Sequence, residues 1–139
     1  MKEYQTDVAA FVLRIALGMM FLAHGFTKLL VLTPEGTAEY FHTLGFPGFF
    51  SYLVIVFEIG GGALLLLGIL TRAIALIAFF QLAIITIVHW TNGWSFTNPG
   101  GGWEYPAFMS LAAFSLALLG TGRFSVLSGK KYTQTVESL

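Results

Sequence analysis

The sequence predicts an all-α integral membrane protein, a bundle of four transmembrane helices with both termini on the cytoplasmic side. Three observations lead to this prediction. Of the 139 residues, 56% are hydrophobic and only 10% are charged, whereas a soluble domain has about 25% charged residues. The apolar residues gather in four long segments, and most lysines and arginines gather at one end of these segments. Too little polar surface is available to cover a water-soluble globule.

The four apolar segments set the expected spans, and we expect residues 1–139 to form one transmembrane domain. A helix needs about 17–25 residues to cross a bilayer. The first two segments meet this length, the third is adequate, and the fourth is short and is expected to extend into the preceding loop. The expected spans are about 8–32, 49–70, 73–90 and 105–120.

The first span is expected to be retained and not cleaved as a signal peptide. Glu3 and Asp7 precede the apolar run, the run is longer than the apolar region of a signal peptide, and no small-residue cleavage site follows it.

The loop charges set the expected orientation. With four spans, the two termini and the second turn lie on the same side of the membrane. An excess of lysine and arginine marks the cytoplasmic face, and only Lys28 is expected near the outer side. The residues on the cytoplasmic side are Lys2, Arg72, Arg123, Lys130 and Lys131.

The first outer loop, residues 33–48, predicts a short amphipathic helix that lies on the outer interface. Thr33 is a candidate N-cap, and Pro34 suits the first helical position. Apolar residues follow at helical spacing until Gly45, which is expected to end the helix.

The second outer loop, residues 91–104, is rich in tryptophan and turn-forming residues. Trp90, Trp94 and Trp103 favour an aromatic belt at the headgroup level. The alternative is a folded lid over a site that opens outward, with the same tryptophans and Glu104 as its candidate residues. Glu104 is also expected to cap the N-terminus of the fourth helix.

Ionisable side chains within the spans point to an internal site. On a helical wheel, Arg14 and Lys28 share one stripe of the first span and His24 lies at its edge, while Glu58 lies on a glycine-bearing face of the second span. Charge that faces lipid at mid-bilayer is costly. These faces are therefore expected to point inward. Glycines on these two faces are expected to allow the helices to pack closely. The glycines are Gly18, Gly25, Gly61 and Gly62.

Counting residues along each helix gives the depth of these side chains. At about 1.5 Å per residue, Glu58 and His24 lie at the same level, with Lys28 one turn nearer the outer side. Arg14 and Gln81 lie lower. The candidates for a ligand pocket between the spans are therefore Arg14, His24, Lys28, Glu58 and His89.

Structural roles remain alternatives for each candidate. Arg14 and Lys28 can extend their charged ends to the membrane surface, or Arg14 can pair with Glu58. Glu58 is either a protonatable functional group or half of a buried ion pair. His24 and His89 suit ordinary hydrogen bonds, and a haem held between them is the less favoured interpretation. No metal site is expected.

Three segments together resemble the DoxX family of small four-span bacterial membrane proteins: "RIALGMMFLAHGFTKL", "FEIGGGALLLLGILTR" and "LLGTGRFS". The resemblance covers nearly the whole chain in order. The family often has an aspartate after its last span, and this chain has Ser128 where such an aspartate is expected. The positions that match the family pattern are Arg14, Gly18, Gly25, Lys28, Glu58, Gly61, Gly62, Gly68, Thr71 and Arg72. Gly68 thereby joins the glycines expected at helix contacts.

The resemblance implies a multi-pass protein of the bacterial plasma membrane. Some relatives are subunits of a membrane thiosulfate:quinone oxidoreductase, and others are associated with redox stress or thiol balance. The resemblance therefore implies that the protein is a membrane component of a redox or quinone-linked system. The cofactor that it implies is a quinone-like apolar ligand, bound in the polar pocket between the spans. An enzymatic role as an oxidoreductase subunit is implied by the resemblance alone.

Two further functions remain open: a small transporter or permeation module, and a non-catalytic membrane anchor subunit. The expected partners are the lipid bilayer, a soluble or membrane-bound redox partner, and a second copy of the chain. The net charge of zero gives no reason to expect nucleic acid.

Overall fold

The computed structural model describes residues 1–127. Of the positions used above, Ser128, Lys130 and Lys131 lie outside these residues. The described part of the chain is all-helical, as the sequence predicts, and contains no strand. Its elements are α1 (Lys2–Phe26), the π-helical η1 (Thr27–Val31), α2 (Pro34–Thr43), α3 (Phe49–Leu67), α4 (Thr71–Val88), the short 3₁₀ turn η2 (Trp90–Asn92) and α5 (Glu104–Leu119).

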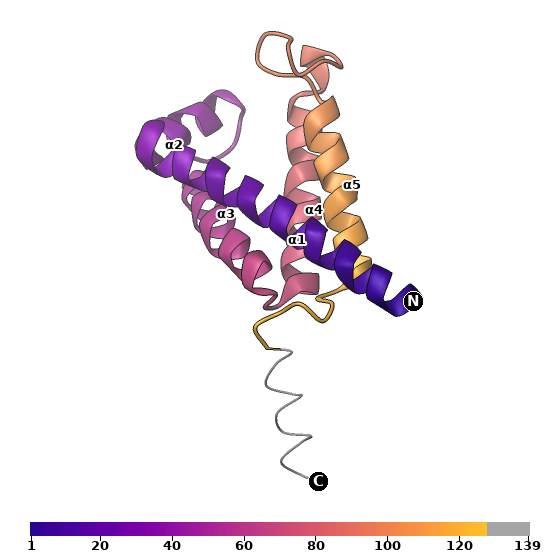
Figure 1. Ribbon diagram of the computed structural model, residues 1–139. Helices are drawn as coiled ribbons and strands as arrows, with labels where there is room; N and C mark the ends of the chain where they lie inside the picture. Colours follow the sequence, from indigo (N-terminus) through magenta and orange to yellow (C-terminus); the bar gives the residue numbers. More distant parts are fainter. Residues whose placement is uncertain (128–139) are drawn as a thin grey trace.

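The long helices form two pairs. Figure 1 shows α1 packed along α3, and α4 packed along α5. α3 and α4 are joined by a tight turn and make far fewer contacts with each other than the partners within each pair do. The two pairs are close together at the end that carries this turn, and they separate toward the end that carries α2 and the loop between α4 and α5 (Figure 1).

Three of the four expected spans have the length and composition of a membrane-crossing helix: Glu3–Val31, Phe49–Leu67 and Thr71–Val88. α5 has 16 residues, about 24 Å of helix against a hydrocarbon core of about 30 Å. A fourth crossing by α5 and the side on which each terminus lies therefore stay predictions. The helix bounds lie close to the expected ones except at α1, which continues through its polar first turns to Lys2.

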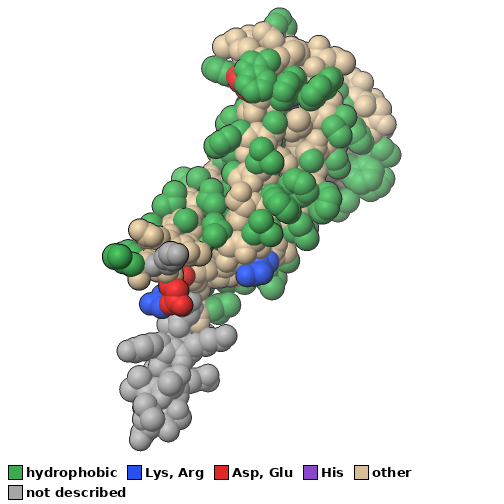
Figure 2. All heavy atoms as spheres, turned by 90° about the vertical axis from the view of Figure 1, so that its right-hand side faces the viewer, with side chains coloured by type: hydrophobic (Ala, Val, Ile, Leu, Met, Phe, Trp, Pro, Cys, Tyr) green, Lys and Arg blue, Asp and Glu red, His purple; other side chains and the backbone are tan. Residues whose placement is uncertain are grey.

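The surface fits a lipid environment. Figure 2 shows apolar side chains spread over most of one face, with charged side chains near its two ends. Large apolar residues on α3 and α4 are more than half exposed, including Val56, Phe80 and Ile87. In water such a surface would be an aggregation hazard, whereas in a bilayer it faces the lipid tails.

Glycines bring α1 and α3 into close contact. A Cβ on Gly18 would lie 2.9 Å from the carbonyl oxygen of Gly62, and a Cβ on Gly62 would lie 2.9 Å from the carbonyl oxygen of Gly18. Further along the same contact, a Cβ on Gly25 would lie 2.7 Å from Cγ1 of Ile59. Any larger residue at these three positions would push the two helices apart.

The other two glycines expected at helix contacts act differently. A Cβ on Gly61 would contact Ile74 of α4 at 3.3 Å. Gly68 ends α3 with a left-handed φ of 71°, a conformation that glycine adopts without steric cost.

The helix predicted in the first outer loop is confirmed as α2. The Thr33 hydroxyl accepts a hydrogen bond from the Gly36 amide at 3.2 Å, and Pro34 is the first helical residue. Gly45, with φ of 84°, follows the end of the helix. The location of α2 on a membrane interface stays a prediction.

Candidate functional site

The most deeply buried carboxylate in the described chain, Glu58 of α3, is held by two side chains from other helices. Glu58 is 2% exposed. Lys28 Nζ donates to Oε1 at 3.0 Å and to Oε2 at 2.7 Å, and Gln81 Nε2 of α4 donates to Oε1 at 3.1 Å. We call these residues the Lys28–Glu58–Gln81 cluster. It joins η1, α3 and α4.

Local backbone structure places Lys28 over the carboxylate. Lys28 lies in the π-helical segment, where the Leu32 amide donates to the Thr27 carbonyl at 3.0 Å. A π-turn rotates the following side chains relative to a regular α-helix, and such segments occur often at functional sites. Gly25 allows the approach, because a Cβ at this position would lie 3.0 Å from Cβ of Glu58.

The cluster is electrically balanced and well satisfied by hydrogen bonds. The ammonium and the carboxylate neutralise each other, and both carboxylate oxygens accept charge-assisted hydrogen bonds. The side chain of Lys28 is 18% exposed and that of Glu58 is 3% exposed. The cluster therefore has a buried acceptor and a cation that reaches its edge.

Gln81 is the contact that sequence reasoning missed. Counting residues placed it well below Glu58, yet the two side chains are hydrogen-bonded. The counting assumed parallel helices, and α3 is strongly inclined to α4 (Figure 1). An amide in an otherwise apolar helix was the available signal. Its bond also links the α1–α3 pair to the α4–α5 pair.

The two candidate histidines form bonds within their own helices. His24 is exposed, and its Nδ1 donates to the Met20 carbonyl at 2.9 Å. His89 is half-buried, and its Nδ1 donates to the Ile85 carbonyl at 2.9 Å. Neither is hydrogen-bonded to the cluster. Within residues 1–127, no three histidine, aspartate or glutamate side chains are grouped as a metal site requires.

Arg14 lies apart from Glu58, at the end of the bundle where α3 turns into α4. It is fully buried, and its Nη2 donates to the carbonyl oxygen of Phe124. Its guanidinium carbon lies 5.6 Å from the centre of the Phe11 ring. The guanidinium occupies the space beside Gly68, where any Cβ would collide with it.

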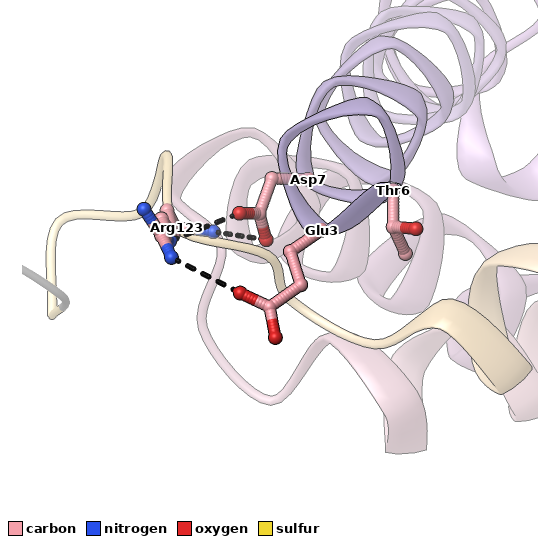
Figure 3. Close-up of a pocket in the computed structure, with 4 residues that line it drawn as sticks. All are labelled: Glu3, Thr6, Asp7 and Arg123. Atoms are coloured by element: carbon pink, nitrogen blue, oxygen red, sulfur yellow. Dashed lines mark hydrogen bonds and ion pairs between the residues drawn. The ribbon is translucent and has the colours of Figure 1, made fainter. Parts of the chain in front are cut away.

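Residues 120–127, which we call the strap, run across this end of the bundle. Arg123 Nε lies 3.1 Å from an Asp7 oxygen, and Nη2 lies 3.6 Å from a Glu3 oxygen. These residues and Thr6 line an open pocket of about 410 Å³, in which the guanidinium faces both carboxylates (Figure 3). Because Arg123 and Glu3 are largely exposed, these ion pairs add little stability.

The loop between α4 and α5 is folded into a compact aromatic unit. The rings of Trp90 and Trp103 stack at 4.6 Å, and Trp94 meets Trp103 edge-on at 4.7 Å. Glu104 lies in the first turn of α5, as expected, but it makes no capping hydrogen bond; its Oε1 accepts from the Phe96 amide at 2.8 Å. The Glu104 carboxylate points toward the loop because it accepts a hydrogen bond from a backbone amide there. The role of this loop as a lid over a ligand site stays a proposal.

The chain is similar in sequence to known bacterial proteins. The family model DoxX matches residues 9–90. "Inner membrane protein YqjF" of Escherichia coli K12 is 34% identical over 134 residues, 91% of this chain and 96% of that protein. "Putative oxidoreductase CatD" of Bacillus subtilis 168 is 31% identical over 124 residues, 87% of this chain and 85% of that protein.

A second Escherichia coli protein, "Inner membrane protein YphA", is 29% identical over 128 residues, 86% of this chain and 88% of that protein. No solved structure matches the chain significantly. The predicted location in a bacterial plasma membrane is confirmed by these relatives and by the three helices long enough to cross a bilayer. The chain belongs to the DoxX family of bacterial membrane proteins.

Proposed function

We propose that this protein is the membrane component of a redox or quinone-linked system, and that it binds a quinone-like apolar ligand beside the Lys28–Glu58–Gln81 cluster. The observation that carries the proposal is the cluster itself: three polar side chains from three helices meet inside an apolar chain. Ionisable residues at such positions are usually functional. A relative named as an oxidoreductase supports the redox connection.

The side chains of the cluster suit the headgroup of a quinone. A quinone carbonyl accepts hydrogen bonds, and it needs a proton source when it is reduced. Lys28 has three N–H donors, and Glu58 accepts two of them, which leaves one donor on the partly exposed side. The Glu58 carboxylate can accept a hydrogen bond from a hydroxyl group of the reduced quinone. A bound quinone would supply the two-electron chemistry that the side chains themselves lack.

The proposed ligand would reach the cluster from the lipid. The two helix pairs separate toward the end that carries α2 and the tryptophan loop (Figure 1). A ligand that is dissolved in the bilayer can approach from the lipid, since the outer faces of α3 and α4 are apolar. The electrons would come from a soluble or membrane-bound redox partner.

Binding to the purified protein tests the proposal. The full chain in detergent is titrated with a short-chain benzoquinone analogue, with tryptophan quenching as the signal, and native quinones are extracted and identified by mass spectrometry. We expect saturable binding that Lys28→Met weakens at least about tenfold, the effect of one lost charge-assisted hydrogen bond. Glu35→Gln, an exposed change in α2, should leave binding unchanged.

The same preparation separates the alternatives. No extractable quinone together with no saturable quenching would contradict the proposal. Ion flux in proteoliposomes that Glu58→Gln abolishes would favour a permeation module. Capture of a soluble redox partner that Glu58→Gln leaves intact, with no ligand bound, would favour a non-catalytic anchor.

A further inference from the structure

Polar atoms are also buried at the end of α3 that is followed by α4. Unlike the atoms of the Lys28–Glu58–Gln81 cluster, they have no hydrogen-bond partners among the described residues. Arg14 is fully buried, and its Nε and Nη1 have no hydrogen-bond acceptor among the described residues. The hydroxyl of Thr71, a residue that is 1% exposed, likewise has none. Arginine keeps its charge in proteins. A buried charge with unused donors is costly unless an opposite charge accompanies it.

These donors lie in or beside the turn between α3 and α4. The Arg14 guanidinium lies against Gly68, the residue that ends α3, where a Cβ would collide with Nη1. Thr71 is the first residue of α4 and follows Leu70, which has a left-handed φ of 51° and provides no side-chain cap. The first amides of a helix have no intrahelical acceptor and carry partial positive charge.

The neighbouring carboxylates are already engaged. Glu3 and Asp7, on the same helix as Arg14, pair with Arg123. Glu58 pairs with Lys28 and is ten residues from Gly68, which is about 15 Å along the helix axis. This end of α3 therefore holds a buried positive charge that no described carboxylate balances.

We propose that the turn between α3 and α4 binds a phosphate-type oxyanion, held by the Arg14 guanidinium, the Thr71 hydroxyl and the first amides of α4. Guanidinium groups, threonine hydroxyls and helix N-termini are the donors that phosphate oxygens accept from in proteins. The site lies away from the Lys28–Glu58–Gln81 cluster and does not depend on the function proposed for it. The phosphate can come from solution or from a phospholipid headgroup, because this end of the bundle is predicted to face the cytoplasm.

The strap closes one side of this site. The Phe124 carbonyl accepts from Nη2 of Arg14, and the Val126 amide donates to the Leu67 carbonyl at 3.1 Å. These two bonds fix the guanidinium and cover the end of α3. The other two nitrogens of the guanidinium, Nε and Nη1, have no acceptor among the described residues, and they are the donors that we assign to the ligand.

Thermal unfolding of the full chain in a neutral detergent tests the proposal. Inorganic phosphate is titrated against sodium chloride at constant ionic strength, and in separate samples phosphatidylglycerol is titrated against phosphatidylcholine in mixed micelles. We expect one of the two phosphate sources to raise Tm saturably, by about 5 °C at ten times its dissociation constant. A response to inorganic phosphate identifies a free anion, and a response to phosphatidylglycerol alone identifies a headgroup.

Three variants make the result specific. Arg14→Gln should abolish the rise in Tm. Thr71→Val keeps the shape of the side chain and should weaken the affinity for phosphate at least about threefold, the effect of one lost neutral hydrogen bond. Glu35→Gln, an exposed change in α2, is the control and should keep the full rise. The proposal is wrong if neither source raises Tm in the unaltered protein, if Thr71→Val binds phosphate as tightly as the unaltered protein, or if a folded Arg14→Gln variant keeps the rise. Because Thr71→Val is nearly isosteric, the test remains decisive even if Arg14→Gln does not fold.

Discussion

Lys28 Nζ lies 3.0 Å from Oε1 and 2.7 Å from Oε2 of Glu58, a carboxylate that is 2% exposed. This bidentate ion pair connects the end of the first long helix with the middle of α3, and Gln81 extends it to α4. Breaking a buried ion pair is destabilising mainly because it leaves the other charge without a partner. The pair therefore explains how a charged glutamate is tolerated in so apolar a helix.

Removing the carboxylate should destabilise the protein strongly. Glu58→Ala leaves the Lys28 ammonium without its counter-charge, and we expect a loss of about 3 kcal/mol in the free energy of unfolding. The exposed Glu35 in α2 provides the control, and Glu35→Ala should change it by no more than about 0.5 kcal/mol. Unfolding by denaturant in detergent measures both. A Glu58→Ala variant as stable as the control would show that the pair is not buried.

A second substitution identifies the partner. In the Glu58→Ala background, Lys28→Met removes the unpaired ammonium and should recover at least about 1 kcal/mol. Arg14→Met should recover nothing, because Arg14 donates to the Phe124 carbonyl at the other end of α3. The double variants are compared by the same unfolding measurement. Recovery by Arg14→Met and none by Lys28→Met would contradict the pairing.

The crossing of α1 and α3 should be sensitive to a single methyl group. Gly62→Ala places a Cβ 2.9 Å from the Gly18 carbonyl oxygen, and we expect it to destabilise the protein by about 1–3 kcal/mol. Gly60 lies two residues earlier, and a Cβ there would meet open space, with no neighbouring atom within 4 Å. Gly60→Ala should be neutral or stabilising by up to about 1 kcal/mol. Equal effects of the two changes on unfolding would contradict close packing at the crossing.

Much of the fold could be predicted from the sequence, because hydrophobic run length and turn residues are local signals. The α2 helix shows this well, since Thr33, Pro34 and Gly45 occupy the start and end positions that their chemistry favours. Helix tilt is not local. Counting residues along parallel helices put Gln81 too low, and it could not choose between Lys28, His24 and Arg14 as neighbours of Glu58.

Apart from the Gln81–Glu58 bond, the contacts that could not be predicted from the sequence involve backbone groups or rare backbone geometry. Arg14 bonds to the carbonyl of Phe124, and Glu104 bonds to the amide of Phe96. Every residue has such groups, so no residue type marks them. The π-helical turn that aims Lys28 at Glu58 has no sequence signature of its own.

The predicted orientation can be checked by labelling single cysteines. The chain has no cysteine, so Thr43→Cys, at the last residue of α2, and Ser128→Cys, the next residue in sequence after the strap, each introduce one reactive thiol. We expect a membrane-impermeant maleimide to label position 43 from the outer side and position 128 only from the cytoplasmic side, because lysine and arginine gather at the latter end. Labelling of position 43 from the cytoplasmic side would reverse the orientation.

Gln81 should limit the separation of the two helix pairs. Gln81→Leu removes the side-chain bond between α3 and α4, which should cost about 1 kcal/mol of stability and allow wider opening. Spin labels on Thr43→Cys and Thr97→Cys, in the two outer loops, would report the separation by pulsed electron resonance. We expect a broader, longer distance distribution in Gln81→Leu than in the control Gln5→Leu, at an exposed position of α1. Identical distributions would show that this bond does not hold the pairs.

The proposed ligand site at the Lys28–Glu58–Gln81 cluster is tested most directly by an experimental structure of the protein in lipid nanodiscs, with its co-purified small molecules identified by mass spectrometry. We expect density for an aromatic headgroup within hydrogen-bond distance of Lys28 or Glu58, and a quinone among the extracted molecules. A closed cluster with only lipid around it, or a quinone bound elsewhere in the protein, would contradict the proposed ligand site.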